Sequence, residues 1–134
     1  ARDHLSALQG RIDAPRERLA RLVQTSAIFF SEDQKLRDPA AAEQTVAELA
    51  QAMRQTEATL RIIGHSDSLG SLPVNRRHGE ARAQFVADML TRAGIAPARL
   101  RIASRADAAP IAPAQSTLNR RATFELAFDG EPSP

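Results

Sequence analysis

Three stretches of the chain space their apolar residues three and four positions apart, which is the period of an amphipathic helix. The first is expected to begin at Asp13 with Pro15 in its first turn, and the second at Asp38 followed by Pro39. Aspartate caps backbone N–H groups at a helix N-terminus, and proline lacks the N–H that would go unpaired there. The third helix follows a polar loop and is expected to end at Gly94, because glycine favours the position after a helix C-terminus.

Four shorter stretches predict strands. Residues 26–30 and 58–64 are apolar runs of strand length, 99–103 has apolar residues on one side, and 121–128 alternates apolar and polar residues. Strands joined through a helix run parallel, and the last strand can return antiparallel. The pattern therefore predicts an α+β two-layer sandwich in the order β-α-β-α-β-β, with a mixed four-stranded sheet and an extra N-terminal helix.

A chain of 134 residues is the size of one domain. We expect an N-terminal extension with a helix over 1–25, the main domain over 26–129 and a tail over 130–134. No apolar run approaches the roughly 18 residues that span a bilayer. We therefore expect any targeting segment or membrane anchor to lie upstream or to have been removed.

The charges and cysteines exclude several classes of function. Eighteen Lys and Arg against sixteen Asp and Glu leave a formal charge of +2, without the clustered basic residues and interleaved aromatics of a nucleic-acid-binding domain. The lack of cysteine excludes a disulfide scaffold and a thiolate metal site. Oligomeric state is left open by the sequence.

One charged residue lies within the apolar stripe of the third helix. Arg82 shares that stripe with Phe85, Val86 and Met89, so its side chain is expected to face the core near the start of the helix. Desolvating an arginine is costly unless an anion meets it, and Asp67 after the preceding strand is the nearest candidate. The pair has two interpretations. It is a structural ion pair, or it is a zwitterion site whose acid takes an ammonium and whose guanidinium takes a carboxylate.

These residues belong to a longer set of motifs with a family resemblance. The set resembles the OmpA-like peptidoglycan-binding domain over about residues 27–128, and it consists of Gly64-His65-Ser66-Asp67, Gly70, Asn75, Arg82-Ala83, Val86 and Asn119-Arg120-Arg121. The resemblance implies a non-catalytic module without a cofactor, in the periplasm of a Gram-negative cell envelope. Such a module anchors an envelope protein by holding the diaminopimelate of the peptidoglycan stem peptide between Asp67 and Arg82.

The resemblance implies further ligand contacts. Ser66 stands where the family has threonine and keeps its hydroxyl, and Arg120 matches an arginine that faces the pocket. Arg120 can equally be a solvated residue at a strand end. Asn75 matches an asparagine at the helix entrance, where it can be an N-cap, a ligand contact, or both.

Two weaker candidates come with a departure from the family pattern. Asp33 lies in the loop where the family has a polar residue near the ligand, and His78 can contact the ligand or be exposed. His78 and Gly79 replace the usual leucine and serine, and Gly79 is expected to delay or bend the first turn of the helix. This departure motivates an alternative function as an assembly domain with weak or lost peptidoglycan binding.

The same loop does not satisfy the patterns of an enzyme or a metal centre. Adjacent Ser, His and Asp residues do not form a catalytic triad, which needs groups converging from separate elements. His65, Asp67 and His78 lack a spacing typical of metal ligands. We therefore expect neither catalysis nor a bound metal.

Overall fold

The computed structural model describes residues 2–66, 71–106 and 117–127, with only the backbone for 2–13, 106 and 117. Three helices, five strands and two 3₁₀ turns make up this part of the chain. In order they are α1 (Arg2–Thr25), β1 (Ile28–Glu32), β2 (Lys35–Leu36), α2 (Pro39–Arg54), β3 (Thr59–His65), α3 (Leu72–Arg92), a 3₁₀ turn (Pro97–Arg99), β4 (Leu100–Ala106), a second 3₁₀ turn (Thr117–Asn119) and β5 (Arg121–Ala127).

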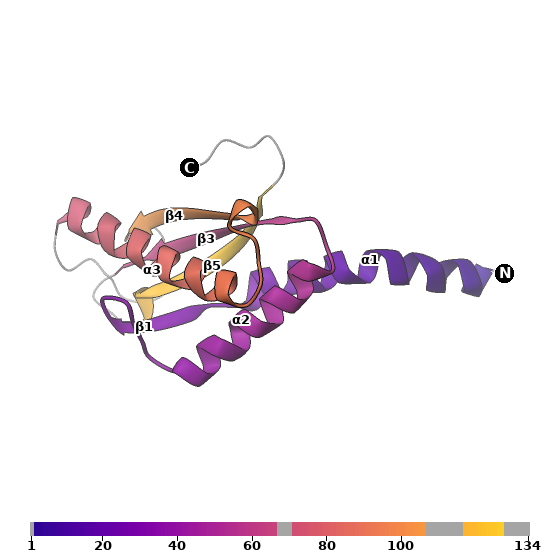
Figure 1. Cartoon of the computed structure of the whole chain (residues 1–134), viewed down its shortest axis with the longest axis horizontal. Coiled ribbons are helices and arrows are strands. Elements are labelled where there is room, and N and C mark those ends of the chain that lie inside the picture. Colours follow the sequence, from indigo (N-terminus) through magenta and orange to yellow (C-terminus); the bar gives the residue numbers. More distant parts are fainter. Residues whose placement is uncertain (1, 67–70, 107–116, 128–134) are drawn as a thin grey trace.

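The strands form one mixed sheet in the order β2-β1-β5-β3-β4 (Figure 1). The last strand, β5, lies in the middle and runs antiparallel to both β1 and β3, whereas β3 and β4 are parallel neighbours. The predicted α+β sandwich with a mixed sheet is therefore confirmed. A fifth strand appears because Lys35 and Leu36, in a predicted loop, pair with Glu32 and Phe30 of β1.

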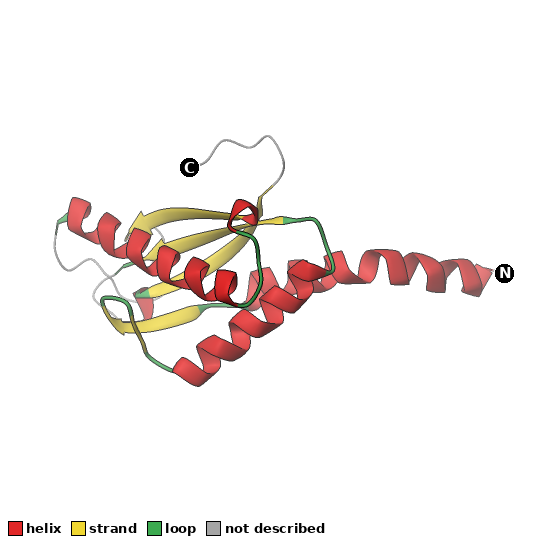
Figure 2. Cartoon of the chain, viewed as in Figure 1, coloured by secondary structure: helices red, strands yellow, loops and turns green. Residues whose placement is uncertain are grey.

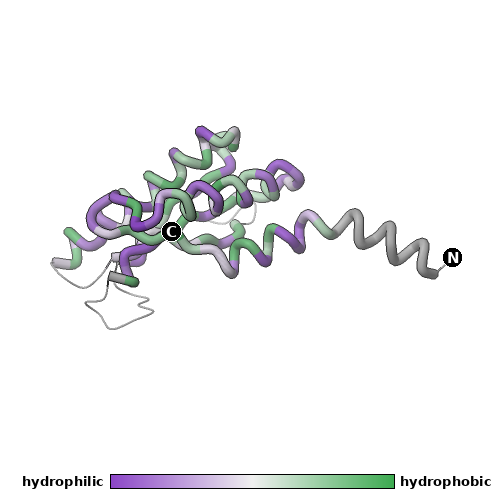
Figure 3. The backbone as a smooth tube through the Cα atoms, turned by 90° about the horizontal axis from the view of Figure 1, so that it is seen from below, coloured by the Kyte–Doolittle hydropathy of each residue, from purple (hydrophilic) through white to green (hydrophobic). Residues whose placement is uncertain are grey.

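The core lies between the helices and one face of the sheet (Figure 2). Alternate residues of β3 and β5 point into it, and Figure 3 shows hydrophobic and hydrophilic residues alternating along the helices. This is the arrangement expected when each element buries one side. The largest fully buried apolar side chains are Leu19, Ile28, Phe30, Leu49, Met53, Leu60, Ile62, Ile63, Val86, Leu90 and Ile95.

Two helix ends follow the predicted capping chemistry. The Asp38 carboxylate accepts a hydrogen bond of 3.1 Å from the Ala41 N–H, and Gly94 has a φ of +102° just after the C-cap of α3. The predicted start at Asp13 is wrong, because α1 is continuous and contains Pro15. Proline removes one backbone hydrogen bond there but does not stop the helix, whose Leu19 is buried in the core.

Helix α3 begins earlier than predicted. Ser71 is its N-cap, accepting a hydrogen bond of 3.4 Å from the Val74 N–H, so the interpretation of Asn75 as the N-cap is wrong. The helix then runs through Gly79, so the expectation that this glycine delays the first turn is wrong. Ser71 supplies the same capping oxygen as asparagine would, four residues earlier.

Candidate functional site

Helix α3 meets strand β3 backbone to backbone at two glycines. A Cβ atom on Gly64 would lie 1.6 Å from the Gly79 carbonyl oxygen, and a Cβ on Gly79 would lie 2.2 Å from Ser104 Oγ. The Ser104 hydroxyl also donates a hydrogen bond of 2.9 Å to the Arg76 carbonyl. The glycine in place of the family's serine therefore allows a close contact that holds the first turns of α3 at the ends of β3 and β4.

Arg82 lies one turn beyond this contact and is buried, as its place on the apolar stripe predicts. Its Nε donates to the Asp33 carbonyl and its Nη1 to the His65 carbonyl, both at 2.8 Å. The guanidinium carbon lies 5.8 Å from the centre of the Phe30 ring, within the range of a cation–π contact. The guanidinium is thus fixed between the β1–β2 turn and the end of β3.

The acid expected opposite Arg82 lies outside the described residues, so the pairing of Asp67 with Arg82 stays a prediction. The residue before it, Ser66, is buried with 3% of its surface exposed. Within the described residues, its Oγ has no hydrogen-bond partner. Ser66 directly follows His65, whose carbonyl accepts a hydrogen bond from Arg82, so Ser66 is the residue next to one that holds the guanidinium.

The turn between β1 and β2 brings three more candidates together. Asp33 has a φ of +43°, a left-handed conformation that aspartate tolerates better than most residues. Its exposed carboxylate lies 3.6 Å from Nδ1 of His78 on α3. Arg120, just before β5, donates from Nη1 to the Ser31 carbonyl. Arg82 and Arg120 therefore hold carbonyls two residues apart, at Asp33 in the turn and at Ser31 near the end of β1.

Asn75 lies within the first turns of α3 and is buried, with 2% of its surface exposed. Its backbone N–H donates a hydrogen bond of 2.9 Å to the Ser71 carbonyl. Because the residue is buried, its side chain lies inside the protein near the helix N-terminus, where partial positive charge favours anions. Three of the seven predicted site residues, Asn75, His78 and Arg82, lie on α3, and Asp33 contacts both Arg82 and His78.

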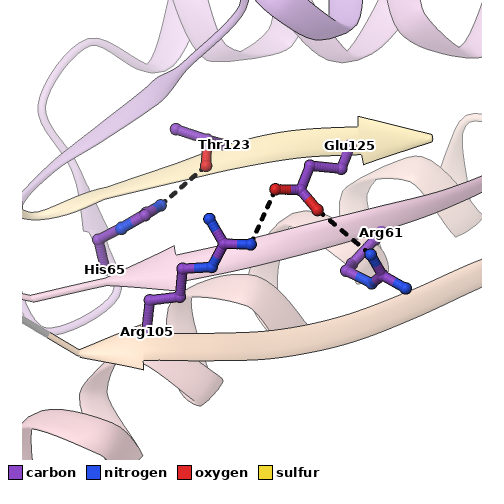
Figure 4. Close-up of polar contacts among 5 residues, drawn as sticks. All are labelled: Arg61, His65, Arg105, Thr123 and Glu125. Carbon is purple, nitrogen blue, oxygen red and sulfur yellow. Dashed lines mark hydrogen bonds and ion pairs between the residues drawn. The ribbon is translucent and has the colours of Figure 1, made fainter. Parts of the chain in front are cut away.

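The opposite face of the sheet carries a polar cluster that the predictions did not include (Figure 4). Glu125 of β5 accepts from Arg105 of β4 at 2.8 Å and pairs with Arg61 of β3 at 3.2 Å. Next to them, His65 Nε2 lies 2.8 Å from Thr123 Oγ1. Alternation of these polar residues along three strands is the sequence signal for this face.

Burial lowers the pKa of His65 most, the nearby cations Arg121 and Arg105 also lower it, and Glu125 partly opposes them, so that the pKa is about 4. The imidazole is therefore neutral at pH 7 and adds no positive charge to this face. Among the described residues, no group of three or more His, Cys, Asp and Glu side chains is placed to hold a metal ion. No helix in the described part of the chain is long and apolar enough to cross a bilayer.

The sequence profile of the OmpA family matches residues 29–123. No curated protein matches the sequence. Among solved structures, the cell wall anchor of the T6SS from Pseudomonas aeruginosa is 30% identical, with a TM-score of 0.57, and the match covers 75% of this chain and 74% of that one.

Two further structures share the fold at lower identity. The peptidoglycan-associated lipoprotein from Burkholderia pseudomallei is 22% identical with a TM-score of 0.63, and the match covers 79% of this chain and 93% of that chain. The C-terminal domain of Helicobacter pylori MotB is 18% identical with a TM-score of 0.65, covering 78% of this chain and 86% of that chain.

Proposed function

This chain belongs to the OmpA family, and we propose that it is a non-catalytic module that binds peptidoglycan and anchors an envelope protein to the cell wall. Two structures of similar fold support the proposal by their descriptions, one as a cell wall anchor and one as a peptidoglycan-associated lipoprotein. The observation that carries it is the buried Arg82 guanidinium, oriented by two carbonyls beside the loop that leads to Asp67.

The proposed ligand is the diaminopimelate side-chain end of the stem peptide. Its carboxylate would meet the Arg82 guanidinium and its ammonium the Asp67 carboxylate. The Asp33 and His65 carbonyls hold Nε and Nη1 of this guanidinium in a fixed orientation. Holding the group in place before the ligand arrives lowers the entropy cost of binding. Hydrogen bonds that involve charged groups contribute about 1.5–3 kcal/mol each.

The remaining candidates surround this pair in the proposal. Ser66 offers its hydroxyl, Asn75 its amide, and Arg120 a second guanidinium, which binds the Ser31 carbonyl of β1. Asp33 and His78 are the weaker candidates for ligand contact, and they meet at the surface, where both side chains are partly exposed. No cofactor takes part, and electrostatics set the orientation of the ligand.

We assign binding to the domain over 26–129, with 1–25 as an N-terminal extension and 130–134 as a tail. The module would work in the periplasm of a Gram-negative envelope. Attachment of the parent protein to a membrane would use a segment outside this chain.

Retention on purified diaminopimelate-type sacculi tests the proposal. Asp67→Ala and Arg82→Ala should each reduce the bound fraction at least about ten-fold, which corresponds to about 1.4 kcal/mol. Arg92→Ala is the matched control, because it removes an exposed arginine from the other end of α3. Arg82→Lys separates charge from shape, since lysine keeps the charge but loses the bidentate geometry. Retention equal to wild type in both alanine variants would end the proposal.

An assembly domain with weak or lost wall binding is the alternative. The contact between His78 and Asp33 favours this alternative, because the histidine stands at a position where the family has leucine. Calorimetry with a diaminopimelate-containing stem peptide separates the two functions. Saturable heat that the Arg82 variant loses excludes the alternative, and no heat with the correctly folded wild type supports it.

A further inference from the structure

Strand β4 forms one edge of the sheet. Within residues 2–66, 71–106 and 117–127, it pairs only with β3. Its seven residues, Leu100–Ala106, contain no proline. An edge strand of this kind presents a row of backbone N–H and C=O groups to which another strand can pair, and an extended peptide can bind in this way.

The side chains of β4 alternate between two different surroundings. Ser104 faces α3, because its hydroxyl binds the Arg76 carbonyl, so Ile102 and Leu100 face the same way. Arg101 and Arg105 point to the opposite face of the sheet, where Arg105 pairs with Glu125 (Figure 4). A strand added to β4 would alternate its own side chains between these two surroundings.

The α3 side of the edge is hollowed on both sides of Ile102, whose surface is 38% exposed. We call these two cavities the edge hollows. One has a volume of about 310 Å³ and the other of about 390 Å³, and Ile102 lines both. The first is lined by Gln84, Ala87, Asp88, Thr91, Pro97, Leu100 and Ile102, and the second by Arg76, Glu80, Ile102, Ala103 and Ser104. Both are open to the surface, and Ile102 supplies apolar surface to each.

Among the described residues, the other side of the edge carries more arginines than carboxylates. Arg61 and Arg105 both contact the carboxylate of Glu125, and the hydrogen bonds of Arg101 within the described residues go to the Ala98 and Leu100 carbonyls. Because His65 is neutral, the excess comes from arginine and does not depend on pH near neutrality. Acidic side chains on an added strand would match this surface.

The arginines of β4 also make a second copy of this chain an unfavourable partner for the edge strand. Antiparallel pairing of two β4 strands about Ala103 would place Arg101 of one copy opposite Arg105 of the other. Like charges directly opposite on neighbouring strands are destabilising. The charges therefore favour an acidic segment over self-pairing.

We propose that β4 binds an extended segment of a partner protein as an additional strand. Its side chains would alternate between acidic residues beside Arg101 and Arg105 and apolar residues in the edge hollows. This binding is separate from the proposed wall site, since it uses the outer edge of β4 and none of the residues assigned to peptidoglycan.

Fluorescence anisotropy with three labelled probes tests the proposal on the whole chain. The first probe is the peptide Val-Glu-Val-Glu-Val-Glu-Val, the second replaces glutamate by lysine, and the third is the first with alternate backbone nitrogens methylated. We expect saturable binding of the first probe and at least about ten-fold weaker binding of the other two. Methylation removes backbone donors without changing the side chains, so it distinguishes strand pairing from charge attraction alone.

Two variants complete the test. Arg101→Glu should weaken binding of the acidic probe at least about ten-fold, and Arg92→Glu, at the end of α3, should leave it unchanged. Amide hydrogen exchange on the wild type should slow along 100–106 when the acidic probe is bound, which needs no variant. No saturable binding, equal binding of the methylated probe, or a dimer in sedimentation that Arg101→Glu strengthens would each overturn the proposal.

Discussion

The carbonyl of Asp33 accepts a hydrogen bond of 2.8 Å from Nε of Arg82, so the turn between β1 and β2 and the helix α3 hold each other in place. The same guanidinium binds the His65 carbonyl at the end of β3. One buried side chain therefore connects three segments that are far apart in the sequence. Any change at Arg82 should consequently alter stability as well as ligand binding.

Arg82→Met tests this structural role. Methionine keeps much of the side-chain length but leaves the Asp33 and His65 carbonyls without their donor, so we expect the free energy of unfolding to fall by about 2 kcal/mol or more. Urea denaturation at pH 7 measures the loss. Arg92→Met, at an exposed position of the same helix, should change the midpoint little. A midpoint equal to wild type for Arg82→Met would show that the two bonds contribute nothing net.

Gly79→Ala should destabilise the domain although alanine is the better helix former by about 1 kcal/mol. Its Cβ would lie 2.2 Å from Ser104 Oγ and 2.9 Å from the Gly64 carbonyl oxygen. Adding Ser104→Ala removes the nearer atom, so the double variant should recover about 1 kcal/mol relative to the sum of the single changes. Additive effects in this double-mutant cycle would contradict the close contact.

Arg99 should be a larger contributor to stability than other partly exposed arginines. Its guanidinium binds the carbonyls of Met53, Thr56 and Ala58 at 2.8–3.1 Å, and so secures the end of α2 to the start of β3. We expect Arg99→Ala to lower the free energy of unfolding by about 2 kcal/mol, measured by urea denaturation. Arg99→Lys should recover only part, because lysine lacks the second nitrogen, Nε, that also binds the Ala58 carbonyl, and the planar shape that orients both nitrogens. Full recovery with lysine would argue against this geometry.

Acid should destabilise the domain through His65. Its pKa of about 4 in the folded protein lies below the usual 6.5, so the unfolded chain binds more protons between these values. Stability from this group is complete above pH 6.5 and is lost as pH falls towards 4, by up to about 1.4 kcal/mol per unit. His65→Gln keeps a hydrogen-bonding group near Thr123 but does not titrate. Urea denaturation at pH 4.5, 5.5 and 7 should therefore give a shallower pH dependence for the variant, and equal slopes would refute the assignment.

The helices and the buried arginine could be predicted because their signals are local. The Asp38 cap and the Arg82 stripe each depend on a few neighbouring residues, and both are present in the structure. Strand β2 was missed because two residues, Lys35 and Leu36, are too short to show a period. The N-cap of α3 was misplaced because Ser71 and Asn75 offer the same capping chemistry, and only the backbone distinguishes them.

The partners of Arg82 were harder to predict. The sequence directs attention to acids such as Asp67, because only side chains carry a residue-specific signal. The structure adds two backbone carbonyls, at Asp33 and His65, which any residue type supplies. The polar face around Glu125 was also missed, since its members come from three strands whose register is set by tertiary pairing.

The central place of β5 has a consequence for biosynthesis. During translation β1 and β3 emerge first, yet neither is bonded to the other, and residues 121–127 supply the bridge between them. The sheet therefore stays in two parts until residues 121–127 have left the ribosome. A chain truncated before residue 121 would expose two strand edges at once, which are sites for aggregation. Release of β5 is thus the step that lets the nascent polypeptide join the two parts of its sheet.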